Sequence, residues 1–218
     1  MGSSVTAAQL IKKSSIIFWD FDGVIKESVD IKGRAFQKLF EVYGTEVMEM
    51  VRIHHENNGG MSRFDKFPVY LKYAGLEVTV EKVTKLCDSF SELVFNGVVN
   101  APWIPGVEDY IRRNSNEQIF IMVSATPQDE LDEIVNELDL RDCFKAIYGA
   151  PLNKSEAIKK SLNELNVTEF NALMIGDASA DLEAALNNHI PFILRKHYSN
   201  LKLSNSYKGL TINDFKKI

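Results

Sequence analysis

Two carboxylates lie two residues apart, as Asp20 and Asp22, at the end of an apolar run that is typical of a buried strand. Alternate side chains of a strand point to opposite faces, so the two share one side only where the chain leaves the sheet toward Gly23. Two like charges are costly to bury without a cation. The pair therefore indicates a divalent-metal site in which one aspartate is a nucleophile, as in aspartyl-phosphate enzymes. The alternative is a plain strand end followed by an Asp-Gly turn.

Three later segments place further polar side chains directly after apolar strand patterns. Ser124 and Ala125 precede a helical pattern, where a hydroxyl and free backbone N–H groups favour an anion. Lys154 opens a helical pattern, although the helix dipole disfavours a cation there. Asp177 and Asp181 follow the next strand pattern. Each has an ordinary alternative as a helix cap or a solvated surface lysine, but their common position after strands predicts an active site.

Apolar periodicity predicts the elements that position these side chains. Short buried strands are expected over residues 16–19, 118–123, 146–148, 172–175 and 191–194. Helical patterns separate the later strands, over residues 130–140, 155–165 and 180–187. This alternation favours an α/β fold, a Rossmann-like doubly wound parallel sheet with helices on both faces and its site at the carboxyl ends of the strands.

The segment between the first two strands has a different character. It contains only helical patterns, over residues 31–43, 47–54, 64–71 and 80–94. We therefore expect an inserted α-helical cap domain of residues 29–100 and a core domain of residues 1–28 and 101–218.

Composition excludes several classes of function. The formal net charge of -5, without a run of basic residues, argues against nucleic-acid binding. No apolar stretch is long enough to span a bilayer, and the N-terminal segment lacks a secretory signal, so we expect a cytoplasmic protein that does not bind membranes. Cys87 and Cys143 have no disulfide-framework or zinc-site spacing. The oligomeric state is left open by the sequence.

The order of the motifs is informative beyond its single parts. An Asp-x-Asp-Gly segment, a hydroxyl after the second core strand, a lysine and a Gly-Asp-x-x-x-Asp segment together resemble the haloacid dehalogenase-like hydrolase superfamily. The match spans nearly the whole chain and is most similar to phosphoglycolate phosphatase and β-phosphoglucomutase-like members, which carry a helical cap. The resemblance implies a magnesium-dependent phosphatase that acts on a small phosphate ester, such as a sugar phosphate or phosphoglycolate.

The resemblance also implies a role for each residue. Asp20 is then the nucleophile and Asp22 the general acid/base, whose pKa we expect to be raised by the surrounding carboxylates. Asp20, the Asp22 carbonyl and Asp177 are the implied Mg²⁺ ligands. The implied phosphate-binding residues are Ser124, Ala125 and Lys154, with Asp181 as a supporting carboxylate near the metal or Lys154. The second Asp favours phosphoryl transfer over dehalogenation.

A Gly-rich turn inside the helical insert ends in Gly60-Met61-Ser62-Arg63. This pattern resembles the substrate-specificity loop of β-phosphoglucomutase-like caps, which implies that Arg63 binds an anionic part of the substrate. The alternative is a simple turn between helices. Of the neighbouring His54 and His55, we expect one to pack inside the insert and one to face solvent.

One departure from the family pattern concerns the type of reaction. Mutases of this kind carry a histidine ten residues beyond the second Asp, where this chain has Lys32. This difference favours a phosphatase over a phosphosugar mutase, and we expect Lys32 itself to be a surface residue. A binding or regulatory protein that retains the fold without turnover is a third interpretation.

Overall fold

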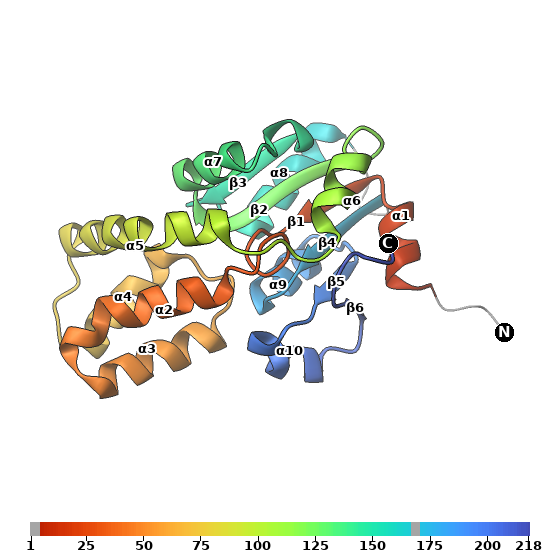
Figure 1. Ribbon diagram of the computed structural model, residues 1–218. Helices are drawn as coiled ribbons and strands as arrows, with labels where there is room; N and C mark the ends of the chain where they lie inside the picture. Colours follow the sequence, from red (N-terminus) through yellow and green to blue (C-terminus); the bar gives the residue numbers. More distant parts are fainter. Residues whose placement is uncertain (1–4, 167–170) are drawn as a thin grey trace.

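The computed structural model describes residues 5–166 and 171–218. Its centre is a parallel sheet of six strands in the order β3-β2-β1-β4-β5-β6 (Figure 1). The strands are β1 (Ile16–Trp19), β2 (Ile119–Pro127), β3 (Ala146–Ala150), β4 (Ala172–Gly176), β5 (Phe192–Arg195) and β6 (Leu210–Ile212). Strand β1 lies in the middle, where Trp19 is in register with Met122 of β2 and Ile175 of β4.

Helices cover both faces of this sheet, because the side chains of β1 alternate between two apolar clusters. Ile17 and Trp19 belong to the cluster that contains residues of α1, α6 and α7, whereas Ile16 and Phe18 belong to the cluster that contains residues of α8 and α9. These helices are α1 (Ala7–Lys13), α6 (Val107–Asn114), α7 (Gln128–Glu137), α8 (Lys154–Leu165) and α9 (Ser179–Asn187). The predicted doubly wound α/β fold is confirmed.

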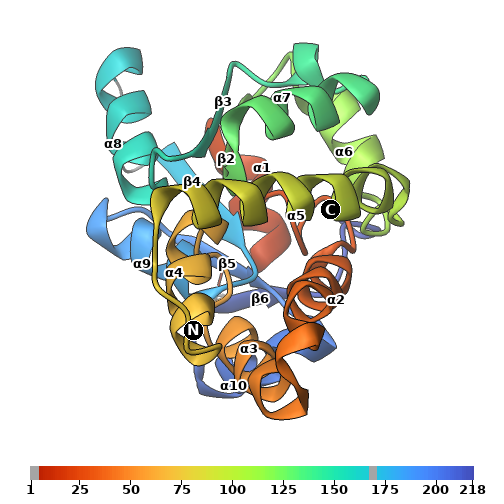
Figure 2. The same ribbon diagram turned by 90° about the vertical axis from the view of Figure 1, so that its left-hand side faces the viewer.

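The segment between β1 and α6 contains helices joined by loops, together with isolated β-bridges of Lys26 to Asp22 and Trp103. It comprises α2 (Val29–Phe40), the 3-10 turn η1 (Glu41–Tyr43), α3 (Thr45–Asn57), α4 (Arg63–Tyr73) and α5 (Val80–Asn100). Aromatic rings hold these helices together, among them Phe36 of α2, which lies 4.2 Å from Phe90 of α5 between ring centroids. Figure 1 shows these four helices at the left of the sheet, and in Figure 2 they face the viewer in front of it. The residue bounds of the two domains stay a prediction.

The apolar periodicity of the sequence did not predict some of the helices and strands. These elements are too short or too polar to give a clear periodicity. They are the helices α1, α6 and α10 (Leu201–Ser206), the edge strand β6, and the 3-10 turns η2 (Arg141–Cys143) and η4 (Tyr198–Asn200). Strand β2 is also longer than predicted, because it continues through an irregular register between Val123 and Pro127. Within the described residues, no helix has the length and apolar character needed to cross a bilayer.

Candidate active site

Asp20 follows the central strand β1 at the carboxyl edge of the sheet. Its backbone N–H donates to the Ile175 carbonyl at 3.0 Å, which continues the ladder between β1 and β4 by one residue. The chain then turns through Gly23, whose φ of +76° disfavours any residue with a side chain. A Cβ at this position would also lie 2.3 Å from Oδ2 of Asp177. The turn therefore brings the two aspartate segments into close contact.

Lys154 neutralises part of the negative charge around Asp20. Its Nζ lies 2.8 Å from Oδ1 of Asp20 and 2.5 Å from Oδ1 of Asp181, and the side chain is only 6% exposed. Asn153 caps helix α8 by accepting from the Glu156 N–H, so the helix begins at Lys154 and directs it into the site. Burial lowers the pKa of Lys154, but Asp181 and Asp20 raise it above its ordinary value. The residue is therefore a cation.

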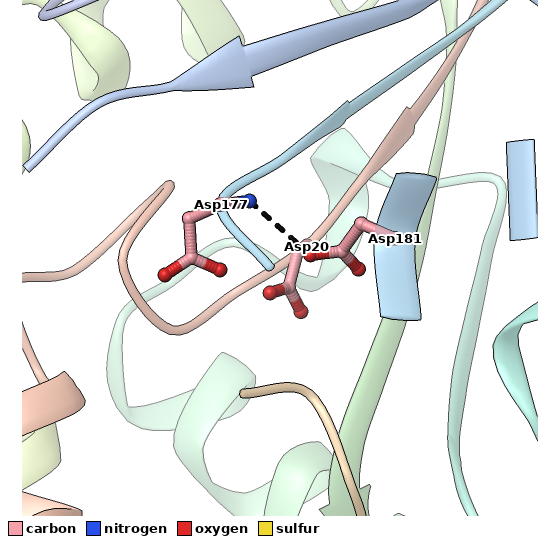
Figure 3. Close-up of side chains that lie close together, drawn as sticks. All are labelled: Asp20, Asp177 and Asp181. Carbon is pink, nitrogen blue, oxygen red and sulfur yellow. Dashed lines mark hydrogen bonds between the residues drawn. The ribbon is translucent and has the colours of Figure 1, made fainter. Parts of the chain in front are cut away.

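Asp181 organises the segment that carries Asp177. Its Oδ2 accepts from the backbone N–H groups of Asp177 at 3.2 Å and Ala178 at 3.0 Å. Figure 3 shows Asp20 between Asp177 and Asp181, with the hydrogen bond from the Asp177 N–H to Asp181 as a dashed line. Since the other oxygen of Asp181 binds Lys154, both oxygens of this carboxylate have protein partners. The role of Asp181 as a supporting carboxylate stays a prediction.

Asp20 and Asp177 are the acidic side chains of this cluster that suit a hard divalent cation, because Lys154 and two backbone N–H groups bind the oxygens of Asp181. Oxygen atoms of Asp20, Asp177 and Asp181 all lie within 4.8 Å of one another, and all three residues are buried. Burial raises the pKa of Asp20 well above its ordinary value, and Asp181 and Asp177 raise it further against the opposing charge of Lys154. A cation beside Asp20 would restore its charged form, and carboxylate oxygens are the ligands that Mg²⁺ prefers. Magnesium binding by these residues stays a prediction.

The Asp22 side chain is bound away from this cluster. It accepts from Ser28 Oγ at 2.6 Å and from Lys32 Nζ, and the Thr126 hydroxyl lies 3.4 Å away. Burial raises the pKa of Asp22, but the charge and hydrogen bond of Lys32, with the Ser28 hydrogen bond, lower it below the ordinary value. The expectation of a raised pKa at Asp22 is therefore wrong, because the nearest charge is a cation rather than another carboxylate.

Lys32 is correspondingly not a surface residue, contrary to expectation. Its side chain is 12% exposed, and besides Asp22 its Nζ donates to Thr126 Oγ1 at 2.7 Å. Lys32 lies on α2, so the first helix of the insert contacts the core site directly. Its position ten residues after Asp22, in the first turn of the predicted helix, was the signal that could have identified it.

Ser124 and Ala125 lie at the same edge, within the irregular end of β2. The Ser124 hydroxyl is buried and lies 3.2 Å from both the hydroxyl and the N–H of Thr126. The walls of the neighbouring cavity include Ala125 and Thr126. The assignment of Ser124, Ala125 and Lys154 to phosphate stays a prediction, to which Thr126 is a structural addition.

Sequence reasoning missed two residues that hold Asp177. His197 Nε2 lies 2.7 Å from Oδ2 of Asp177, and the Asn200 side chain donates to the Asp177 carbonyl at 2.7 Å. Both residues follow β5, which lies beside β4, so they reach the same edge of the sheet. The end of a fifth predicted strand was the available signal, although it contains no repeated carboxylate or glycine motif.

The sequence model of the haloacid dehalogenase-like hydrolases matches residues 16–194, which include every core residue of the predicted site. The chain belongs to this family. The predicted resemblance is thus confirmed, and the protein is a member of a family of hydrolases. No curated protein matches the sequence.

Solved structures share the fold of this haloacid dehalogenase-like hydrolase at low identity. A structure of CbbY from Rhodobacter sphaeroides in complex with xylulose-1,5-bisphosphate has a TM-score of 0.74 and 15% identity, and the match covers 94% of this chain and 96% of that one. The structure of β-phosphoglucomutase from Clostridium difficile has a TM-score of 0.71 and 23% identity, and the match covers 94% of this chain and 93% of that one. The structure of a predicted phosphoglycolate phosphatase from Haemophilus somnus has a TM-score of 0.70 and 14% identity, and the match covers 93% of this chain and 95% of that one.

The insert of this family member contacts the core beside Lys154. Gly60, with a φ of +77°, lies so close to helix α9 that a Cβ would be 2.9 Å from the Cβ of Ala180. A cavity of about 680 Å³ lies between insert and core, and Asp20, Asp22 and Lys154 are among the residues that line it. The Gly-rich turn therefore lies against α9 and close to the Lys154 amine.

Arg63 lines this cavity, but its charge is already paired. Its guanidinium donates to the Glu130 carboxylate at 2.7 and 2.6 Å and to the Ser91 hydroxyl at 2.7 Å, and the Arg63 side chain is 3% exposed. Glu130 belongs to α7 of the core, so this ion pair links the insert to the core. The assignment of Arg63 to substrate stays a prediction.

The two neighbouring histidines are both half-buried. The ring of His54 packs 5.3 Å from that of Tyr70, and His55 lines the cavity. The expectation that one of them faces solvent is therefore wrong, because His54 packs against α4 and His55 lies at the cavity.

Proposed function

We propose that this haloacid dehalogenase-like hydrolase is a Mg²⁺-dependent phosphatase that hydrolyses a small phosphate monoester through a phosphoaspartate at Asp20. The observation that carries the proposal is the contact of 2.8 Å between Asp20 and Lys154 beneath the cavity. A buried carboxylate with a fixed counter-charge, open to a cavity, suits a nucleophile for phosphorus. We expect the substrate to be a metabolite such as a sugar phosphate or phosphoglycolate, and the enzyme to be cytoplasmic.

Electrostatics decide how the ester is accommodated. A phosphate dianion is repelled by Asp20, Asp177 and Asp181, and Lys154 offsets only part of this charge. Mg²⁺, bound by Asp20, Asp177 and the Asp22 carbonyl, would neutralise the remaining charge as the phosphoryl group is transferred. Ala125 and Thr126 line the cavity, and the Ser124 hydroxyl lies beside Thr126. We expect hydroxyl and backbone N–H groups of these residues to bind the phosphoryl oxygens.

The reaction then proceeds in two displacements at phosphorus. A carboxylate oxygen of Asp20 forms a bond to phosphorus while the bond to the ester oxygen breaks, and protonated Asp22 donates its proton to the leaving alkoxide. Water next attacks the phosphoaspartate and gives its proton to the Asp22 carboxylate, which releases inorganic phosphate and restores Asp20. The charge and hydrogen bond of Lys32 favour the charged form of Asp22, which is the form that accepts this proton. The first displacement therefore requires that Asp22 takes up a proton before the ester oxygen leaves.

Phosphate release from a panel of phosphorylated metabolites and p-nitrophenyl phosphate, with Mg²⁺ and with EDTA, tests the proposal. We expect release that requires Mg²⁺ and disappears in Asp20→Asn. If no compound yields phosphate, the protein is not a phosphatase of this kind. Interconversion of phosphosugar isomers in the presence of a bisphosphate, without net release, would instead identify a mutase.

A further inference from the structure

Lys66 of α4 is a buried amine that the proposed reaction does not use. The residue is 2% exposed and lines the cavity that contains Asp20. Its Nζ lies 3.1 Å from Nδ1 of His55 and 5.3 Å from the centre of the Phe36 ring. Within the described part of the chain, the ammonium group has no carboxylate within ion-pair distance.

The other cations of the cavity wall differ in this respect. Lys154 pairs with Asp20, Lys32 with Asp22, and Arg63 with Glu130. Arg34 and Lys202 are exposed, and Arg52 pairs with Glu49 and Glu56 near the rim. Among the buried cations that line the cavity in the described residues, Lys66 alone lacks an anionic partner. A buried charge without a partner is costly, so proteins normally pair it.

The surroundings of Lys66 keep it available for a ligand. Burial and the like charges of Lys66 and Lys32 hold the pKa of His55 well below its ordinary value, so the neutral ring offers Nδ1 as an acceptor. His55 therefore orients the amine without neutralising it. Burial and the charge of Lys32 also lower the pKa of Lys66, to about 7, whereas an anion bound beside it would favour the charged form.

We propose that Lys66, oriented by His55, binds a second anionic group at the end of the substrate remote from the phosphoryl group. The substrate is thus a small phosphate monoester that carries a carboxylate or a second phosphate. This inference rests on the proposed phosphatase function. It also transfers the recognition of a substrate anion from Arg63, whose guanidinium is paired with Glu130, to a cation without such a partner.

The test compares two series of phosphate esters of increasing chain length, which end in a carboxylate or in a hydroxyl. Alkanediol bisphosphates form a third series, which distinguishes a second phosphate from a carboxylate. We expect kcat/KM to be about tenfold or more higher for an anionic ester than for its hydroxyl counterpart of matching length. Lys66→Met should abolish this preference, so that kcat/KM becomes equal for an anionic ester and its hydroxyl counterpart. Arg52→Gln, which removes a cation from the cavity rim, should retain the preference.

The possible outcomes separate this inference from the proposed function. Hydrolysis of hydroxyl esters with no preference for any anionic series, or a preference that survives Lys66→Met, overturns the role of Lys66 but leaves the phosphatase intact. If no ester is hydrolysed, the anion site is tested by calorimetry, which measures the binding of phosphonates that end in a carboxylate or in a methyl group. Tighter binding of the carboxylate compound that is lost in Lys66→Met supports the anion site, and equal binding of the two compounds overturns it.

Discussion

The Arg63 guanidinium and the Glu130 carboxylate form a buried ion pair with two hydrogen bonds, of 2.7 and 2.6 Å, between α4 of the insert and α7 of the core. Removing one partner leaves the other charge buried and unpaired. We therefore expect Arg63→Met to lower the free energy of unfolding by about 3–5 kcal/mol in urea titrations. Lys38→Met, which breaks an exposed pair with Glu41, should cost less than about 1 kcal/mol.

A double-mutant cycle shows whether the pair itself is responsible. Because Arg63→Met with Glu130→Leu leaves no unpaired charge, this double variant should regain most of the stability that the single variant loses. Losses that simply add in the double variant would contradict a direct coupling between the two side chains.

Gly60 lies in close contact with α9. In Gly60→Ala, the new Cβ would lie 2.9 Å from that of Ala180, so the turn must shift away from Lys154. We expect kcat/KM to fall by about tenfold or more, because the residues around the cavity lose their relative positions. Gly75→Ala is the matched control, since Gly75 also has a positive φ, of +69°, but has open space around it.

Both alanine variants should lose about 1 kcal/mol of stability through backbone strain. Only Gly60→Ala should lose activity. Equal activity of the two variants, measured as phosphate release, would mean that contact between this turn and α9 is not required for turnover.

Lys66 predicts a pH dependence of stability. Burial first, and then the charge of Lys32, lower the pKa of its amine from 10.5 to about 7, with Asp22 opposing and His55 in contact. Between these values the unfolded chain binds a proton that the folded protein does not, so stability falls as the pH decreases from 10.5 to 7. Below that range the loss is complete and constant.

Because Lys66→Met has no amine at this position, its stability does not fall in this way as the pH decreases. We therefore expect the variant to be more stable than the wild type by several kcal/mol at neutral pH, with the difference shrinking toward pH 10.5. Chemical denaturation across this pH range provides the measurement. A variant that is less stable than the wild type at neutral pH would show that Lys66 contributes to the fold rather than opposing it.

Asp22→Asn separates the two displacements. Nitrophenolate leaves without a proton, so the first step should survive for p-nitrophenyl phosphate, whereas attack by water loses its base. We expect a burst of nitrophenol that is stoichiometric with enzyme, followed by turnover that is slower by about 10²–10⁴-fold. Stopped-flow absorbance measures both phases. Steady turnover at the wild-type rate would remove Asp22 from the mechanism.

The sequence was sufficient to predict which strand ends form this site. It was insufficient to predict which charged side chains pair there. Asp20, Lys154 and Asp177 follow strands whose apolar patterns are strong, and parallel strands bring their carboxyl ends together. By contrast, the pairing of Asp22 with Lys32 requires α2 to fold back over the sheet edge. A helical pattern defines which face of α2 is apolar but not where the helix docks.

The same limit applies to the contacts between insert and core. Glu130 is one acidic residue among several near the start of α7, and only the tertiary structure distinguishes it as the partner of Arg63. His197 likewise reaches Asp177 because β5 lies beside β4, although the two are separated along the chain by α9. Long-range pairing of single polar residues leaves no local pattern in a sequence.

Formation of a phosphoaspartate at Asp20 is the central claim, and it can be measured directly. The Asp22→Asn enzyme is mixed with Mg²⁺ and p-nitrophenyl phosphate and quenched in acid, and its peptides are then analysed by mass spectrometry. We predict that one phosphoryl group is attached to Asp20, and that none is attached in the Asp20→Asn/Asp22→Asn variant. Phosphate release by the wild-type protein, with no phosphorylated Asp20 in the quenched variant, would contradict the account.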